Sequence, residues 1–242
     1  MTPESTRYFF VHLQKTAGTS FARQMKDAFG RRAIYPCDDD GDPIARVIDV
    51  DHLVDRWHER RDEIVVVTGH YPLCTVQLLD APFVTFTILR HPVERTLSYL
   101  RHHRKVTAED QDLTLEEVYA DPDRFDGLIH NHMVKMFSLT TDEMTNGALT
   151  VVDFTPEHLE RAKRNLAAID LFGLQERYGQ FCTEANRQFG WELGPPLHMN
   201  RTTVTDVEPE LLERIAGDNA MDLELYEFAR DLHAQRYGTA VE

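Results

Sequence analysis

Cysteine is scarce in this sequence, and the three residues present form no metal-binding or disulfide pattern. Cys37, Cys74 and Cys182 are scattered over 242 residues without a CxxC pair. An odd and dispersed set argues against a disulfide framework and against a zinc site. We therefore expect small buried hydrophobic side chains in a reducing compartment, and we predict a cytoplasmic location.

Long apolar runs are also absent. No stretch approaches the roughly 20 apolar residues that a membrane-spanning helix needs. The opening MTPESTRYFF lacks the basic-then-apolar order of a signal peptide. We expect no membrane span in this sequence, and the length suits one domain over residues 1–242 with a sizeable core.

Positive charge is in short supply. The formal net charge is −15, from 26 Lys and Arg against 41 Asp and Glu. This balance disfavours nucleic acid or anionic membrane as a partner of the whole surface, but it is compatible with a local basic site. The acidic run DDDGDP at 38–43 is interpreted as a surface turn. A metal loop is the alternative, although the spacing does not complete a calcium-loop pattern.

Apolar runs and helical patterns alternate along the chain. The runs are rich in Val, Ile and Phe without polar alternation, as in parallel strands covered on both faces. They predict an α/β fold with a mainly parallel, P-loop-like sheet flanked by helices and a helical C-terminal half. The predicted strands are Tyr8–His12, Ile64–Thr68, Phe83–Leu89 and Leu171–Leu174. The predicted helices are Thr19–Phe29, Val50–Arg60, Pro92–Lys105, Thr114–Ala120, Phe125–Leu139, one starting at Thr155, one ending near Phe189, and Glu208–Arg236.

A phosphate-binding loop is predicted after the first strand. The segment FFVHLQKTAGTSFARQM, residues 9–25, places a Lys with small and hydroxyl residues between a strand and a helix. Gly18 permits close approach of an anion, and the amides of 18–20 form an exposed helix start that favours phosphate. Lys15 supplies a mobile positive charge. The Gly-x-x-x-x-Gly-Lys-Ser/Thr loop of nucleotide triphosphatases is nevertheless absent.

A second anion site is predicted at the end of the third strand. In FTILRHPVERTLSYLRHHR, residues 86–104, Arg90 ends the strand and Ser98 lies on the helix that Pro92 begins. Together they offer bidentate and single hydrogen bonds to an anion. The alternative is an ion pair between Arg90 and Glu94. Two anion sites on neighbouring strand ends imply a ligand that is phosphorylated at two places.

The pair KTAGTS and R-x-P-x-E-R-x-x-S-Y resembles the signature of sulfotransferases that use 3′-phosphoadenosine 5′-phosphosulfate (PAPS). The resemblance implies that the first loop holds the 5′-phosphosulfate, that Arg90 and Ser98 hold the 3′-phosphate, and that 3′-phosphoadenosine 5′-phosphate (PAP) is the product. It also implies that no metal is needed.

Further segments resemble the carbohydrate sulfotransferases of the heparan 2-O/6-O and chondroitin type. HLQKTAGTSF resembles their opening, although Gln14 replaces a common Pro. NHMVKMFSL resembles their N-x-x-x-R-x-L segment, with Lys135 where Arg is usual, and FGLQERYGQF resembles G-L-x-E-R-F. LHMNRTTV resembles a loop that closes over the nucleotide. The residues expected to bind the nucleotide are Lys15, Thr16, Gly18, Thr19, Ser20, Arg90, Ser98, Arg201 and Thr202.

The expected reaction moves SO₃ from a phosphate oxygen to an acceptor hydroxyl or amine. The resemblance implies that the acceptor is a sugar, a glycolipid or another small molecule. Lys15 is expected to stabilise charge on the leaving oxygen. His70 follows the second strand, at the sheet edge of the phosphate loops, and is the predicted general base. The resemblance places a His there too. His12, His130 and His132 are fallback candidates, and RHHRK at 101–105 could hold an acidic acceptor.

Two other readings stay open from the sequence. A small-molecule kinase or nucleotide triphosphatase on a similar fold would need ATP and magnesium, and the Arg90/Ser98 pair counts against it. A nucleotide-binding protein without catalysis would keep the loop and lack a base, and His70 counts against it. Tyr71 and Pro72 are expected to line the acceptor cleft.

Overall fold

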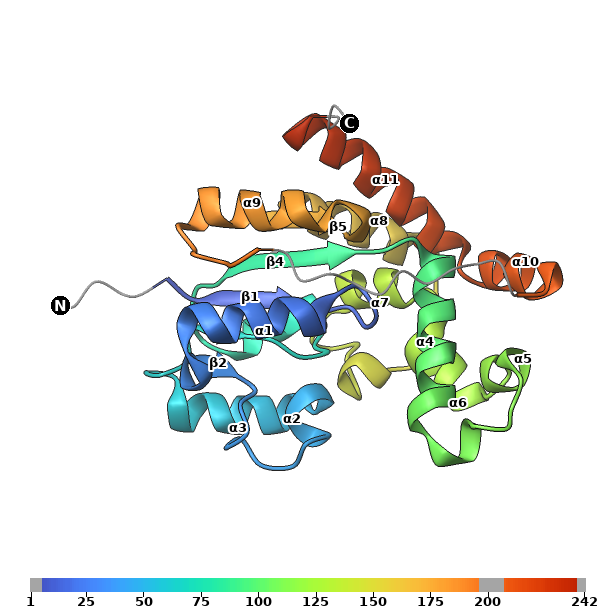
Figure 1. Cartoon of the computed structure of the whole chain (residues 1–242), viewed down its shortest axis with the longest axis horizontal. Coiled ribbons are helices and arrows are strands. Elements are labelled where there is room, and N and C mark those ends of the chain that lie inside the picture. Colours follow the sequence, from blue (N-terminus) through green and yellow to red (C-terminus); the bar gives the residue numbers. More distant parts are fainter. Residues whose placement is uncertain (1–5, 196–206, 239–242) are drawn as a thin grey trace.

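A computed structural model describes residues 6–195 and 207–238 of the chain. At its centre lies a five-stranded sheet of order β2-β3-β1-β4-β5, in which all neighbouring strands are parallel. Helices lie on both sides of this sheet (Figure 1). The strands are β1 (Tyr8–Val11), β2 (Ile34–Tyr35), β3 (Val66–Val67), β4 (Val84–Leu89) and β5 (Leu171–Leu174). The predicted α/β fold with a mainly parallel sheet is confirmed.

The helices follow the strands in the order expected for such a fold. Those of the first half are α1 (Gly18–Phe29), α2 (Ala45–Ile48), α3 (Val50–Arg60), α4 (Pro92–Val106), α5 (Leu115–Tyr119), α6 (Pro122–Arg124) and α7 (His132–Ser138). Those of the second half are α8 (Pro156–Ala168), α9 (Tyr178–Phe189), α10 (Pro209–Asp218) and α11 (Ala220–Tyr237). Within the two described ranges, no helix is both long and apolar enough to cross a membrane.

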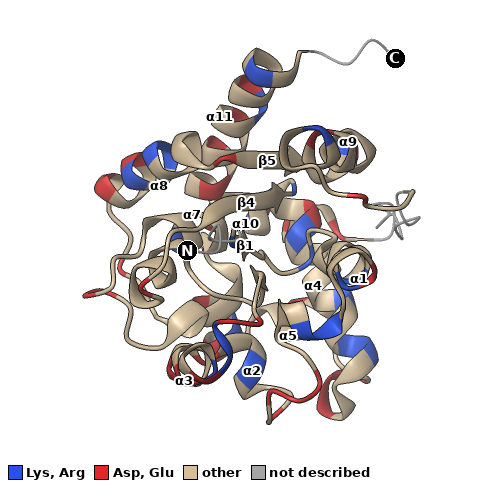
Figure 2. Ribbon diagram, turned by 90° about the vertical axis from the view of Figure 1, so that its left-hand side faces the viewer, with Lys and Arg blue, Asp and Glu red and all other residues tan. Residues whose placement is uncertain are grey.

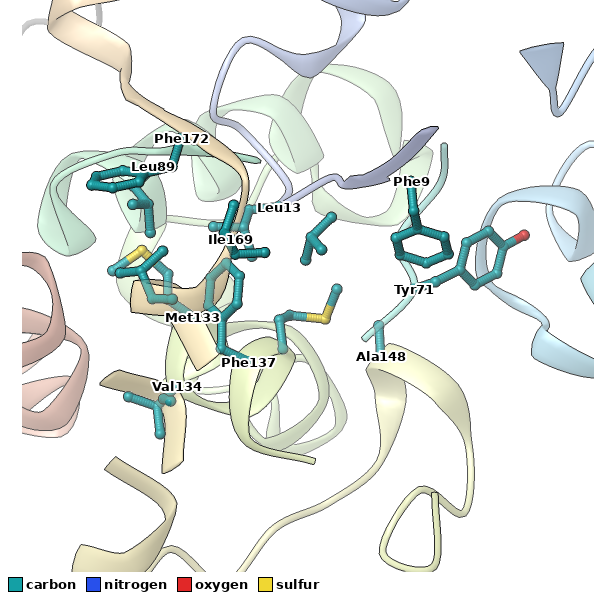
Figure 3. Packing of buried hydrophobic residues seen from close by; sticks show 14 of the residues in the cluster. Phe9, Leu13, Tyr71, Leu89, Met133, Val134, Phe137, Ala148, Ile169 and Phe172 are labelled. Atoms are coloured by element: carbon teal, nitrogen blue, oxygen red, sulfur yellow. The ribbon is translucent and has the colours of Figure 1, made fainter. Parts of the chain in front are cut away.

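The two faces of the sheet bury alternate residues of the same strands. Phe9 and Val11 point into a core that also contains side chains of α3, α7, α8 and α11, part of which Figure 3 shows. Tyr8 and Phe10 point into the opposite core, against α1 and α9. Successive strand residues face opposite sides, so an apolar run without alternation is what a strand covered on both faces requires.

A third apolar cluster lies beyond the sheet. It joins Leu97 and Leu100 of α4 to Val118 of α5 and Ile215 of α10. These apolar contacts hold α4, the helix that follows β4, in place at one end of the sheet. The position of α4 matters because it carries Ser98 and the RHHRK segment.

Several predicted elements are interrupted or shorter than expected. The predicted helix Phe125–Leu139 is instead a π-helical turn at Phe125–Ile129 and a separate α7, because Asn131 adopts a left-handed conformation between them. The predicted helix Glu208–Arg236 is likewise divided at Asn219, between α10 and α11. The predicted strand Ile64–Thr68 is regular only at β3, and β2 was not predicted at all.

The acidic run at 38–43 is more than a surface turn. Asp40 is fully buried, accepts a hydrogen bond from the Cys37 amide at 2.6 Å and is paired with Arg60. Its own carbonyl bonds to His52 Nε2 at 2.6 Å. The buried carboxylate of Asp40 is therefore paired with a cation, and the contacts of Asp40 with Arg60 and His52 connect this loop to α3. Among the described residues, no group of three or more His, Cys, Asp or Glu is arranged to hold a metal ion.

Candidate active site

The loop between β1 and α1, residues 12–18, has the backbone of an anion-binding turn. Lys15 and Ala17 both have positive φ, 66° and 81°. Inside the turn, Thr16 is buried and its hydroxyl donates to the Leu13 carbonyl at 2.9 Å. The Thr16 side chain therefore stabilises the loop from within. We call residues 12–18 the phosphate loop.

The N-terminus of α1 is available to an anion. Ala17 occupies the N-cap position, and its methyl side chain makes no capping hydrogen bond to the first amides of this twelve-residue helix. Gly18 and Thr19 open the helix, and the Ser20 amide turns back to the Ala17 carbonyl at 3.0 Å. Uncapped amides and the positive end of the helix dipole favour a phosphate or sulfate group. A phosphosulfate thus fits the residues present.

Gly18 is required by its neighbour His12. A Cβ at position 18 would lie 1.7 Å from Nε2 of His12, far inside van der Waals contact. The His12 ring has little room to retreat, because it is stacked on Phe10 with ring centroids 5.0 Å apart and lies 4.6 Å from the ring of His70. The phosphate loop therefore rests directly on the imidazole of His12.

Arg90 lies beside the phosphate loop because β4 pairs with β1, with Phe10 opposite Phe86. Its Nη1 donates to the Lys15 carbonyl at 3.2 Å, and its Nε donates to Glu94 at 3.4 Å. Arg90 therefore reaches the phosphate loop and also makes the pair with Glu94 that the sequence left open, while its contact with a phosphate stays a prediction. Burial lowers the pKa of the Arg90 guanidinium, and burial together with Arg90 lowers the pKa of Lys15.

Ser98 lies on α4, six residues after the first residue of the helix, or about 9 Å along its axis. His102 is one turn further on, at the i+4 position that shares a face with Ser98. Burial and the charge of Lys15 lower the pKa of His102. The helix α4 begins two residues after Arg90, which contacts the phosphate loop.

His70 is oriented by two backbone contacts. Its Nδ1 lies 2.9 Å from the His12 carbonyl, and its amide donates to the Val47 carbonyl at 2.7 Å. A carbonyl only accepts, so Nδ1 carries the proton and Nε2 keeps its lone pair. Burial lowers the pKa of His70, the bond to His12 opposes that shift, and Lys15 adds to it. A neutral imidazole with a free Nε2 is the form that a general base requires.

A cleft of about 860 Å³ opens beside His70. One wall comes from α1 and the turn that follows it, and it carries Arg23, Lys26 and Arg31 with a single acidic residue, Asp27. The other walls come from the ends of β2, β3 and α2. The lining residues are His12, Ala22, Arg23, Lys26, Asp27, Gly30, Arg31, Pro36, Val47, Thr68, Gly69 and His70. We call this space the His70 cleft.

The basic wall of the His70 cleft was not predicted. Arg23 and Lys26 are three residues apart on the helix that starts at the phosphate loop, and this spacing was the available signal. The predicted cleft residue Tyr71 lies elsewhere: its side chain is fully buried, and Pro72 is buried too. Tyr71 belongs to the apolar core instead of the cleft.

The fallback histidines occupy different positions. His12 adjoins His70, but its ring supports the phosphate loop. His130 is stacked on Phe125 with ring centroids 5.2 Å apart. His132 is completely buried, so it does not meet an acceptor in the cleft. The predicted nucleotide contacts Arg201 and Thr202 lie outside the described residues.

Comparison with known proteins identifies the family. A family model described as "Sulfotransferase family" matches residues 1–229. The chain belongs to the sulfotransferase family. The resemblance inferred from the two anion-binding motifs is thereby confirmed, and the phosphate loop and Arg90 lie within the matched range.

The similar sequences are carbohydrate sulfotransferases by name. Heparan-sulfate 6-O-sulfotransferase 2 of Danio rerio is 33% identical over 179 residues, covering 62% of this chain and 38% of that protein. Heparan-sulfate 6-O-sulfotransferase 1 of Homo sapiens is 27% identical over 280 residues, covering 94% of this chain and 66% of that protein. The chain therefore spans between about two fifths and two thirds of these two relatives.

A solved structure has the same fold. The crystal structure of a sulfotransferase from Alicyclobacillus acidocaldarius aligns with a TM-score of 0.53 and covers 97% of each chain. Only 17% of the aligned residues are identical. At that level the likeness concerns the fold, and it matches the parallel sheet and helical layers of this family member.

Proposed function

We propose that this protein transfers a sulfuryl group from PAPS to a hydroxyl of a carbohydrate acceptor, with His70 as general base. One observation carries the proposal: His70 has its Nδ1 on the His12 carbonyl and lines a cleft beside the phosphate loop. Membership of the sulfotransferase family supports the reaction type, and the similarity to heparan-sulfate 6-O-sulfotransferases supports a sugar acceptor.

The donor would lie across the ends of β1 and β4. The amides at the start of α1, together with Lys15, would hold the 5′-phosphosulfate. Arg90 and Ser98 would hold the 3′-phosphate, with Arg90 exchanging its contact with Glu94 for the stronger charge of the phosphate. Ligands of parallel α/β sheets bind outside the carboxyl ends of the strands, which supports this placement.

The proposed step forms a bond between the acceptor oxygen and sulfur, and it breaks the bond between sulfur and the bridging phosphate oxygen. When bound, PAPS supplies the sulfuryl group and leaves as PAP. His70 Nε2 receives the proton of the acceptor hydroxyl. Lys15 and the α1 amides stabilise the negative charge that develops on the phosphate. All of these groups belong to two neighbouring strand ends and the loop after β3.

The acceptor would lie in the His70 cleft. The wall formed by Arg23, Lys26 and Arg31 suits a sugar that carries carboxylate or sulfate groups, and Val47 and Pro36 offer apolar surface to the C–H faces of a sugar ring. Arg and Lys segments are otherwise intermixed with Asp and Glu around the molecule (Figure 2). The local basic wall would let a protein of net charge −15 bind an anionic acceptor.

Calorimetry with PAP tests the donor site. We expect PAP to bind the full chain in the presence of EDTA, and ATP with magnesium to bind far more weakly. A preference for magnesium-ATP would overturn the proposal and favour a kinase.

A transfer assay tests the reaction itself. Incubation with sulfur-35-labelled PAPS and heparan sulfate or a desulfated derivative should give a labelled polymer. Binding of PAP without label transfer to any of a panel of polysaccharides, glycolipids and small hydroxylated acceptors would favour a binding protein without catalysis.

A further inference from the structure

The hydroxyl of Tyr71 is an unexpected feature next to the proposed base. Its ring is fully buried, packed so closely over Gly69 that a Cβ there would lie 2.4 Å from Cε2 of the tyrosine. In Figure 3 the ring lies beside Phe9, and its hydroxyl oxygen points away from the rest of the cluster. That hydroxyl donates to the Arg46 carbonyl at 2.8 Å.

Two successive carbonyls of α2 therefore receive hydrogen bonds from two successive residues of the loop after β3. Arg46 accepts from the Tyr71 hydroxyl, and Val47 accepts from the His70 amide at 2.7 Å. Carbonyls at the end of a helix have no partner within that helix. In the four-residue helix α2, these carbonyls can accept hydrogen bonds from another segment of the chain.

The position of α2 is fixed from its other side. The Arg46 guanidinium donates to the Cys37 carbonyl at 2.9 Å and lies 3.7 Å from Asp38. The Ile48 carbonyl is so close to Gly147 that a Cβ there would lie 2.9 Å from it. Because the acidic loop and the turn at Gly147 hold α2 in place, the residues that donate to its carbonyls are held in place too.

We propose that Tyr71 is a positioning residue, which anchors the loop after β3 on the carbonyls of α2 and so holds His70 with Nε2 toward the cleft. This inference rests on the proposed function for its catalytic meaning. The anchoring itself concerns only this chain, so it can be measured without donor or acceptor.

Histidine NMR is the direct test. In protein labelled with ¹⁵N at histidine, the His70 resonances are assigned with His70→Gln, and tautomer and pKa are read from a pH titration. The wild-type ring should show a proton on Nδ1 and a pKa below 6.5. Among the described residues, the charged and titratable groups near His70 include His12, Lys15 and, on the α7 side, His132. Arg23, Lys26, Asp27 and Arg31 line the same cleft.

Tyr71→Phe keeps the ring and removes the bond to α2. We expect His70 to lose its fixed Nδ1–H tautomer and its pKa to rise toward 6.5, because a looser loop admits water and the pKa was lowered mainly by burial. In the transfer assay, kcat should fall about three- to ten-fold while PAP affinity stays within two-fold. The acid limb of the pH profile should move up with the His70 pKa.

Tyr35→Phe is the matched control. Tyr35 is also fully buried in the same cluster, and its hydroxyl accepts from that of Tyr71 at 3.4 Å, but among the described residues it is the Tyr71 hydroxyl that bonds to α2. We expect this variant to leave the tautomer and pKa of His70 unchanged. His158, whose Nδ1 accepts from the Thr155 amide at 3.1 Å, should be unaffected in both variants.

Two results would overturn the inference. One is an unchanged His70 tautomer and pKa in Tyr71→Phe. The other is an equal change in Tyr35→Phe, which would assign the effect to general loss of core packing. A wild-type protein that fails to bind PAP would instead count against the proposed function alone, because the NMR comparison would keep its outcome.

Discussion

The proposed donor side and the proposed acceptor side of the site share one edge of the sheet, but they are assembled in different ways. The donor side uses two continuous segments, the phosphate loop and the stretch from Arg90 to Ser98, which adjacent strands β1 and β4 place together. The acceptor side draws on α1, the ends of β2 and β3, and the short helix α2. A site built from contiguous motifs can be recognised in a sequence, whereas a site assembled from distant segments cannot.

The sharpest way to separate the two sides is to remove the proposed base. His70→Ala should lower kcat by about 10²- to 10⁴-fold, the usual contribution of general base catalysis, and leave PAP affinity within about two-fold. Steady-state transfer assays and calorimetry on the same preparation give both numbers. His58→Ala, an exposed histidine of α3, serves as the control. Turnover that survives the loss of His70 would show that the base is another residue.

The converse change acts on the donor side. Arg90→Ala should weaken PAP binding by about 10- to 100-fold, since hydrogen bonds to a charged group contribute about 1.5–3 kcal/mol. Calorimetry measures the effect. Arg187→Ala, which removes a surface arginine paired with Glu184 on α9, should leave PAP affinity unchanged. Equal affinity in both variants would assign Arg90 to its pairing with Glu94 alone.

The smallest expected effect concerns the basic wall. The double variant Arg23→Gln and Lys26→Gln should raise the KM for an anionic polysaccharide about two- to five-fold, because exposed charges each contribute less than about 1 kcal/mol. The kcat and the PAP affinity should not change, and added salt should narrow the difference from wild type. Arg230→Gln on α11 is the control. A change in PAP affinity instead of KM would place this wall on the donor side.

The sequence allowed the sheet and most helix starts to be predicted, for identifiable physical reasons, whereas the residues named for the donor stay a prediction. The helix predicted at Thr114–Ala120 is present as α5, and its capping box between Thr114 and Glu117 is satisfied by neighbours in the chain. The break at Asn131 could not be foreseen, because the conformation there depends on bonds to Asn219 and Asp222, about 90 residues away. The basic cleft depends in the same way on how α1 meets β2 and β3.

Lys135 shows how a departure from a family pattern is accommodated. It stands where the resembling sulfotransferases usually have Arg, and its ammonium donates to the carbonyls of Asp126, Gly127 and Thr150. Three acceptors match the three protons of a lysine, although burial lowers its pKa to about 7. The residue therefore joins the π-helical turn to α7, and nothing in its sequence pattern indicated these partners.

The cytoplasmic location stays a prediction.

His12 has a consequence for how the site could change in evolution. Its carbonyl orients the proposed base, and its ring carries the phosphate loop at Gly18. A substitution at position 18 would thus displace His12 and change the orientation of His70 as well as the binding of the nucleotide. Specificity for a new acceptor can evolve through substitutions in the walls of the cleft. The phosphate loop and the proposed base, in contrast, must evolve together, because both depend on His12.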